Sequence, residues 1–218
     1  MLKSYKKHVQ ERADLNIPPL PLDADQTSQL VELLKSEHDE SDFLLNLFKE
    51  RVPAGVDQAA YVKAAFLADI SEGNASSPYI DNIEAVKILG TMLGGYNIQP
   101  LIKCLKNDEL AATAVDTLSK TLLILDAFNE IFELSKTNKY AEQVIKNWAD
   151  ATWFTDKQDL PKKIKLTVYK VSGEINTDDL SPAPDAWSRP DIPLHALAMF
   201  KMPRAGLSDP LETIDKLK

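Results

Sequence analysis

The sequence lacks paired cysteines, a long apolar run and an excess of basic residues, and each lack excludes a class of protein. Its one cysteine, Cys104, can form neither an intrachain disulfide nor a four-cysteine cluster, which favours a reducing compartment. No apolar run is long enough to span a bilayer, and the N-terminus, MLKSYKKHVQERADL, has no apolar secretory core. The formal net charge of −8 disfavours generic nucleic-acid binding. Together they predict a cytoplasmic protein without a membrane partner.

What the sequence does contain is a strong helical pattern over its first 160 residues. The chain has 218 residues, 44% of them hydrophobic, which suits one large domain or one domain with part of a second. Apolar side chains recur at helical spacing between short turns marked by Pro, Gly, Asn and Asp. The expected helices are 2–14, one capped by Asp25, one from Ser41 or Asp42, 57–68, one capped by Asp81 and ended by Gly94 and Gly95, one containing Pro100, 109–119, 121–135 and 138–151.

The lengths of these helices and of their connections are typical of helical hairpins. The segment NIQPLIKCLKNDELAATAVDTLSK, residues 97–120, has the pattern of one HEAT-like repeat, with Pro100 in a first helix and a turn at Asp108. Repeat periodicity is irregular elsewhere, so a plain helical bundle is the alternative.

The character of the chain changes at Pro161. KLTVYK, residues 165–170, alternates polar and apolar side chains and predicts a strand. A polar loop at 173–193 follows, then helices at 194–202 and 208–218. Because one strand leaves its edges unpaired, this region is expected to be incomplete. The predicted fold class is mainly α: a HEAT-like helical-hairpin domain at 1–160, then a truncated α/β segment at 161–218.

The loop GEINTDDLSPAPDAWSRPDIP holds the candidate functional residues. Asp178 and Asp179 have the chemistry to orient a histidine or to act as acid–base groups, and Arg189 can bind a carboxylate through two hydrogen bonds. In the alternative reading both aspartates cap neighbouring amides and Arg189 makes a surface ion pair. Composition alone favours this alternative.

A resemblance to a known family favours the functional interpretation of these residues over the structural one. INTDDLSPA resembles the TDxxSPA-type signature of the aconitase swivel domain. The longer string NTDDLSPAPDAWSRPDIPLHALAM resembles the aconitate hydratase B family, the bacterial aconitases with an N-terminal helical domain. Three upstream segments resemble the same family: RVPAGVDQAAYVKAAFLADI, LGTMLGGYNIQPLI and NWADATWF. The resemblance covers essentially the whole chain.

The resemblance implies a hydro-lyase of the tricarboxylic acid cycle that interconverts citrate and isocitrate through cis-aconitate. It implies that a [4Fe–4S] cluster with one open iron serves as Lewis acid in the full-length enzyme. Asp178 matches the family aspartate that supports an acid–base histidine, and Arg189 matches an arginine that holds a substrate carboxylate. Asp179 and Ser181 are weaker candidates. Residues 161–218 would then be the first part of the swivel domain.

The chain also departs from the family pattern. The cluster needs three cysteine ligands, whereas Cys104 stands alone on an apolar helix face and is read as a core residue. The Gly-Ser-Ser-Arg-type loop and the cluster-binding domains are absent. We therefore expect this fragment to hold no metal or cofactor and to be inactive without the remaining domains. His8, His38 and His195 are interpreted as structural.

A second hypothesis makes the helical region an interaction module. Helical repeats present extended surfaces to proteins or RNA. The resemblance implies homodimer formation through this region and mRNA binding by the iron-free form. Lys3, Lys6, Lys7 and Arg12 would give a basic face, although the acidic balance of the chain argues against strong RNA binding.

Overall fold

The computed structural model describes residues 1–14, 19–122, 124–157, 159–166, 168, 170–189 and 192–201. It divides into two compact units, one of residues 21–158 and one of residues 1–20 with 159–218. Within the described ranges the regular structure is helical and contains no strand, which confirms a mainly α fold. None of the helices in these ranges is long and apolar enough to cross a membrane.

In the described part of residues 21–158 the structure has nine helical segments. They are α2 (Ala24–Leu34), α3 (Ser41–Asn46) with the π-helical turn η1 (Leu47–Arg51), α4 (Gln58–Glu72), α5 (Asn82–Leu89), α6 (Ile98–Cys104), α7 (Ala111–Lys120), α8 (Ala127–Ser135), α9 (Lys139–Ala149) and α10 (Thr152–Thr155), counting η1 with α3.

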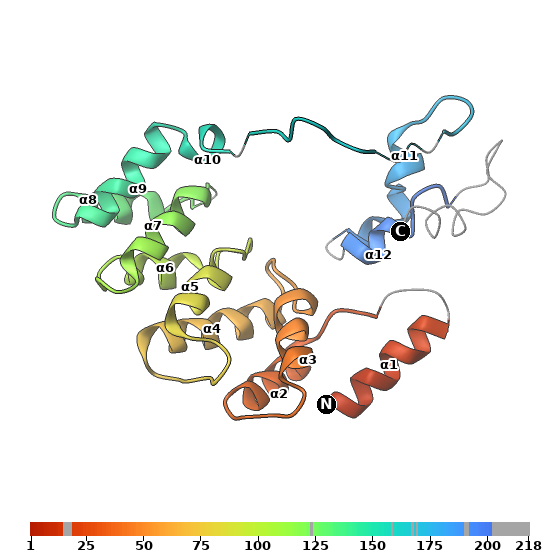
Figure 1. The fold of residues 1–218 in the computed structure, drawn as a ribbon, viewed down its shortest axis with the longest axis horizontal. Coiled ribbons are helices and arrows are strands. Elements are labelled where there is room, and N and C mark those ends of the chain that lie inside the picture. Colours follow the sequence, from red (N-terminus) through yellow and green to blue (C-terminus); the bar gives the residue numbers. More distant parts are fainter. Residues whose placement is uncertain are drawn as a thin grey trace. The chain divides into compact units, whose positions relative to one another are not determined.

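Three antiparallel hairpins form the body of this unit. Helix α4 packs on α5, α6 on α7, and α8 on α9. The first helices of the hairpins follow one another as a row, α4–α6–α8, and the second helices as another, α5–α7–α9 (Figure 1). Helix α2 covers α4 at one end, and α10 packs on α7 and α9 at the other. The predicted helical hairpins are confirmed, and their stacking is that of a hairpin repeat.

Side-chain caps set where the helices begin. Asp57 accepts a hydrogen bond from the Ala59 amide at 2.7 Å, and Asp81 accepts one from the Glu84 amide at 2.7 Å. The cap at Asp81 was predicted, and helix α4 was expected to begin at residue 57 without a cap being named. The prediction of Asp25 as a cap was wrong, because Asp23 caps α2.

The end of α5 and the start of α8 differ from the prediction, and side chains from later in the chain bind carbonyls beside both boundaries. Helix α5 ends at Leu89 and not at Gly94, and the side-chain amide of Asn97 donates to the Leu89 carbonyl at 2.9 Å. Residues 121–122 and 124–126 are not helical, and the Trp148 indole donates to the Leu118 carbonyl at 3.0 Å. Each carbonyl also accepts a backbone amide, that of Met92 at 3.1 Å and that of Thr121 at 3.0 Å, so the side chain adds a second hydrogen bond at each helix end.

The loop before α4, which contains Ala54 and Gly55, contacts the loop after α5, which contains Leu93 and Gly94. The Leu93 amide donates to the Ala54 carbonyl at 2.8 Å. A Cβ on Gly94 would lie 1.9 Å from the carbonyl oxygen of Gly55, so the contact requires glycine at this position. Glycine permits this approach and does not end a helix here.

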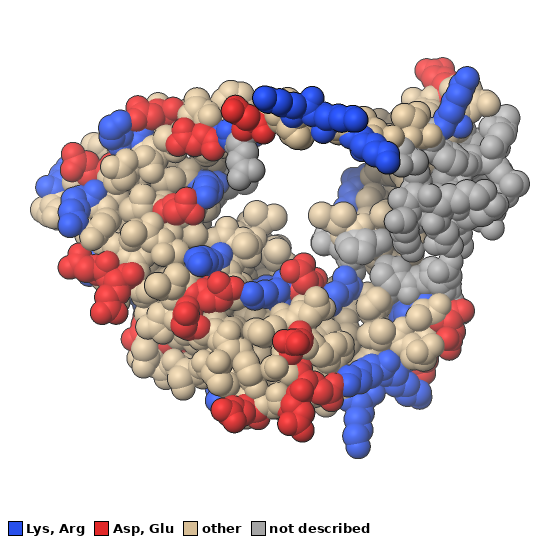
Figure 2. Space-filling view, viewed as in Figure 1, with Lys and Arg blue, Asp and Glu red and all other residues tan. Residues whose placement is uncertain are grey.

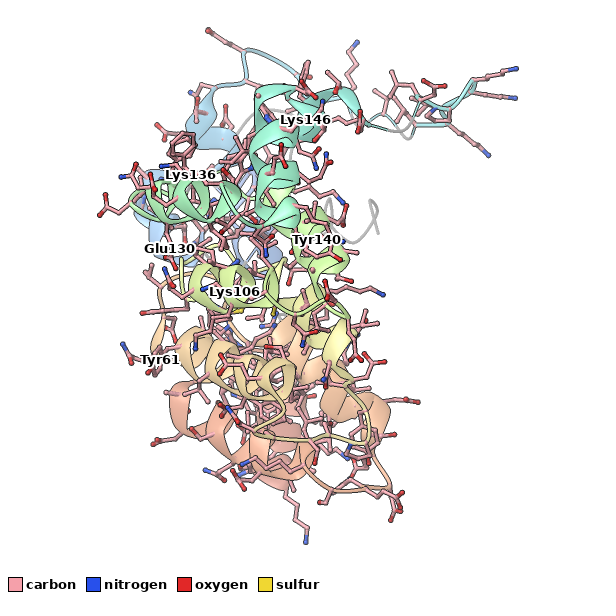
Figure 3. All side chains as sticks on the ribbon, turned by 90° about the vertical axis from the view of Figure 1, so that its left-hand side faces the viewer. Tyr61, Lys106, Glu130, Lys136, Tyr140 and Lys146 are labelled. Carbon is pink, nitrogen blue, oxygen red and sulfur yellow. The ribbon has the colours of Figure 1, made fainter. Side chains whose placement is uncertain are left out.

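Charged side chains of both signs are interspersed over the surface of the helical unit (Figure 2). Some of them link neighbouring helices: Lys49 pairs with Glu84 at 2.6 Å, and Lys103 with Glu72 at 2.8 Å. Others pair within one helix, such as Lys136 with Glu133 at 2.6 Å; Lys136 is labelled in Figure 3. These exposed pairs fix the surface pattern and contribute little to stability.

The second unit contains α1 (Leu2–Asp14), which the sequence predicted, together with α11 (Thr177–Leu180), η2 (Ala183–Ser188) and α12 (Ile192–Ala196). The strand predicted at 165–170 is wrong for the residues described there. Leu166 and Val168 are 76% and 84% exposed, and no strand among the described residues pairs with this segment. An isolated strand leaves its backbone groups unpaired, so the segment stays irregular. The helix predicted at 208–218 lies outside the described residues.

Candidate functional site

The candidate loop is built on α11, a single helical turn capped by its own side chains. Asn176 accepts a hydrogen bond from the Asp179 amide at 3.1 Å, and the Asp179 carboxylate accepts one from the Asn176 amide at 3.0 Å. This reciprocal pair is a capping box. Asp179 therefore occupies a structural position, as the alternative reading of the loop expected.

Asp178 and Arg189 are placed differently from Asp179. Both side chains are exposed, and neither makes an ion pair or side-chain hydrogen bond with any residue in the described ranges. Arg189 follows the 3-10 helix η2, and its amide donates to the Ala186 carbonyl at 3.2 Å. The surface ion pair of the alternative reading does not form among the described residues. The guanidinium fork and the Asp178 carboxylate both remain available to a partner.

An imidazole connects the two parts of the loop. The Nε2 atom of His195 lies 2.8 Å from the Ser181 hydroxyl, and its Nδ1 atom lies 2.8 Å from the Ser188 hydroxyl. Ser188 also donates to the Asp185 carbonyl at 2.7 Å. Sequence reasoning had treated His195 as a capping or packing residue and did not consider Ser188. No periodic element spans the three positions, so no pattern in the sequence signals that they meet.

A backbone hydrogen bond and an ion pair join residues 200–201, after α12, to α11 and η2. The Phe200 amide donates to the Asp179 carbonyl at 2.6 Å, and Lys201 pairs with Asp185 at 2.9 Å. Ala198 and Phe200 are buried and give the segment a small apolar centre. These contacts join described residues on both sides of the imidazole, while the side chains of Asp178 and Arg189 are exposed.

Cys104 does not belong to this site. It lies in α6, is 3% exposed, and burial raises the pKa of its thiol. Among the described residues no three His, Cys, Asp or Glu side chains gather to hold a metal ion. An iron–sulfur cluster with three thiolate ligands does not fit this chain, whose sequence has one cysteine.

The arrangement suits recognition of an anionic ligand. An exposed guanidinium binds a carboxylate through two parallel hydrogen bonds, and a nearby carboxylate can orient a basic group. The structure does not bring the Asp178 and Arg189 side chains into contact with each other within the described ranges.

Comparison with known proteins gives two family models and several curated relatives. The model described as Aconitate B N-terminal domain matches residues 4–154, and the model described as Aconitate hydratase 2 N-terminus matches residues 166–218. Aconitate hydratase B of Escherichia coli is 57% identical over 95% of the chain, and that of Pseudomonas aeruginosa is 54% identical over 100%. Aconitate hydratase B of Helicobacter pylori is 47% identical over 92% of the chain. The chain spans about a quarter of the length of these relatives, between 24% and 26%.

Proposed function

The chain belongs to the family of aconitate hydratase B N-terminal domains, and on that premise we propose that it is the N-terminal part of a hydro-lyase that interconverts citrate and isocitrate through cis-aconitate. The observation that carries this proposal is the likeness to relatives named Aconitate hydratase B over 92% to 100% of the chain. The enzyme would act in the tricarboxylic acid cycle in the cytoplasm, and a single buried cysteine is compatible with that compartment.

Two domains are part of the same proposal. Residues 1–160 would be the helical domain, and residues 161–218 the first part of the swivel domain. The two family models lie on either side of this boundary, since one ends at residue 154 and the other begins at residue 166. The hairpin array supports a separately folded helical domain.

Arg189 is proposed to bind a carboxylate of the tricarboxylate substrate. Its side chain is exposed and contacts no partner in the described part of the chain, so a substrate would not have to displace an existing ion pair. A guanidinium and a carboxylate pair through two hydrogen bonds of matched geometry.

Asp178 is proposed to orient an acid–base histidine supplied by another domain. Its neighbour Asp179 is held in the capping box, which leaves Asp178 as the aspartate with an outward carboxylate. Asp179 would support the loop, and Ser181 would lie beside the substrate.

The [4Fe–4S] cluster of the full-length enzyme would be bound by other domains. Bound there, it would supply the Lewis acid for removal and addition of water. This chain would contribute substrate and acid–base contacts, and no step of the reaction is assigned to Cys104.

Assembly through the helical domain is the second candidate function. The stacked hairpins offer the extended surface that homodimer formation would use. Binding of mRNA by the iron-free form receives less support, because the net charge of −8 opposes a phosphate backbone.

A hybrid enzyme tests the main proposal. This chain would replace the corresponding N-terminal quarter of Escherichia coli aconitate hydratase B, followed by cluster reconstitution and measurement of cis-aconitate by absorbance. We expect the hybrid to turn over citrate and isocitrate and the chain alone to be inactive. Turnover by the chain alone, or a folded, cluster-loaded hybrid without turnover, would contradict the proposal.

A further inference from the structure

His195 links the two segments that carry the candidate site residues, and we propose that it is a positioning residue. As a neutral imidazole protonated on Nδ1, it fixes the Ser181 hydroxyl and the backbone that carries Arg189. The hydrogen-bond assignment stands on the contacts alone, whereas its consequence for turnover rests on the proposed function.

The direction of each hydrogen bond follows from counting hydrogens. A hydroxyl group has one hydrogen, and that of Ser188 points to the Asp185 carbonyl at 2.7 Å. The 2.8 Å contact between Ser188 and His195 must therefore use the hydrogen of Nδ1 and a lone pair of Ser188. A neutral imidazole has one N–H group, so Nε2 accepts the hydrogen of Ser181 across 2.8 Å.

The hydrogen bonds of His195 to Ser181 and Ser188, here called the relay, join the segment after α11 to the end of η2. Ser181 directly follows α11, which contains Asp178, and Ser188 directly precedes Arg189. Ser188 is 4% exposed and its bond to the imidazole is partly buried, so leaving the Ser188 hydroxyl without this partner would cost stability. The imidazole thus holds the aspartate segment and the arginine segment at a fixed separation.

The relay also decides what Ser181 can bind. Its hydrogen is committed to His195, and its remaining lone pairs can accept a hydrogen bond but cannot offer one. Ser181 is therefore matched to a donor, and in the proposed reaction that donor is the hydroxyl group of citrate or isocitrate. Carboxylates of the substrate would be left to Arg189.

Nitrogen-15 NMR of the histidine rings tests the assignment on the chain itself. The sequence has three histidines, and the other two serve as internal references. His8 accepts from the Leu20 amide through Nε2 at 2.9 Å, whereas His38 accepts from the Glu40 amide through Nδ1 at 3.0 Å. At a pH of about 8, where most imidazoles are neutral, we expect His195 to carry its hydrogen on Nδ1, as His8 does and His38 does not.

Two serine variants make the test specific. Ser188→Ala removes the acceptor of the Nδ1 hydrogen and is expected to shift His195 toward the other tautomer. Ser135→Ala removes a hydroxyl bonded within α8 and should leave the His195 signals unchanged. Protonation of His195 on Nε2 in the unsubstituted chain, or an unchanged ring spectrum in Ser188→Ala, would overturn the assignment.

Kinetics of the hybrid enzyme test the consequence. His195→Asn can place its amide nitrogen, a donor, near the Nδ1 position, and His195→Gln can place its amide oxygen, an acceptor, near Nε2, so each variant keeps one half of the bridge. Both are expected to lower kcat/KM roughly ten- to a hundredfold at unchanged cluster content. Wild-type kcat/KM in either variant would overturn the positioning role. An inactive unsubstituted hybrid would instead refute the proposed function, and the ring spectrum would still decide the hydrogen-bond assignment.

Discussion

Replacing Lys63 with methionine is expected to stabilise the chain, and to do so less as the pH rises. Lys63 lies in α4 and is 2% exposed. Its ammonium donates to the Lys49 carbonyl at 3.2 Å and lies 5.2 Å from the centre of the Phe48 ring. Burial lowers the pKa of Lys63 from 10.5 to about 8, although the nearby Glu50 acts in the opposite direction.

The size of the effect follows from this pKa. Because the unfolded chain holds the Lys63 proton more tightly, protonation of Lys63 costs the folded state about 3 kcal/mol at pH 7. Between about pH 8 and 10.5 the unfolded state binds more protons than the folded state, so the free energy of unfolding rises with pH. At pH 10 the cost falls to about 1 kcal/mol. Methionine has no charge, and its net gain at pH 7 is about 2 kcal/mol after loss of one hydrogen bond.

Urea unfolding followed by circular dichroism at pH 7 and pH 10 measures this difference. Subtracting the Lys63→Met result from that of the unsubstituted chain removes the titration of every other group. Lys106, an exposed lysine labelled in Figure 3, provides the control, and Lys106→Met should change stability equally at both pH values. A Lys63→Met effect that is the same at pH 7 and pH 10 would refute the reasoning.

Three other perturbations test separate parts of the structure. In the hybrid enzyme, Arg189→Lys should raise KM for isocitrate and lower kcat/KM at least roughly tenfold, because an ammonium cannot form the two parallel hydrogen bonds of a guanidinium. The melting temperature of the hybrid should not change. An unchanged KM would contradict the assignment of Arg189 to substrate binding. Gly94→Ala should lower the free energy of unfolding by about 2–3 kcal/mol in urea titrations, since its Cβ would meet the Gly55 carbonyl, whereas Gly55→Ala, with open space around it, should have little effect. Trypsin should cut first after Lys162, Lys163 or Lys165, which are exposed and outside any helix. A first cut located by mass spectrometry inside α4–α9 would contradict the proposed domain boundary at residue 160.

Helix starts could be predicted from the sequence because a cap is a local interaction. Asp81 was correct, since its carboxylate bonds to the Glu84 amide three residues ahead. Asp25 was wrong because Asp23 also precedes the helix and has Gln26 three residues later, which completes a capping box. The glutamine was the signal that distinguishes the two aspartates.

Features that depend on distant residues could not be predicted. The end of α5 and the start of α8 differ from the prediction, and the side chains of Asn97 and Trp148 bind carbonyls beside these two boundaries. In the site, the sequence indicated Asp178, Asp179, Ser181 and Arg189 as candidates, and these assignments stay predictions. It gave no sign of the His195 bridge, because that contact exists only once η2 and α12 have folded.

The two-row stacking of the hairpins has a consequence for how the chain acquires its structure during synthesis. Each hairpin packs mainly on the next one in sequence, so most contacts join residues that emerge from the ribosome close together in time. The α4–α5 hairpin can form before α8 and α9 have been translated, and each later hairpin adds to an existing surface. Nascent chains would then expose an unpartnered apolar face mainly in the interval between synthesis of the two helices of one hairpin.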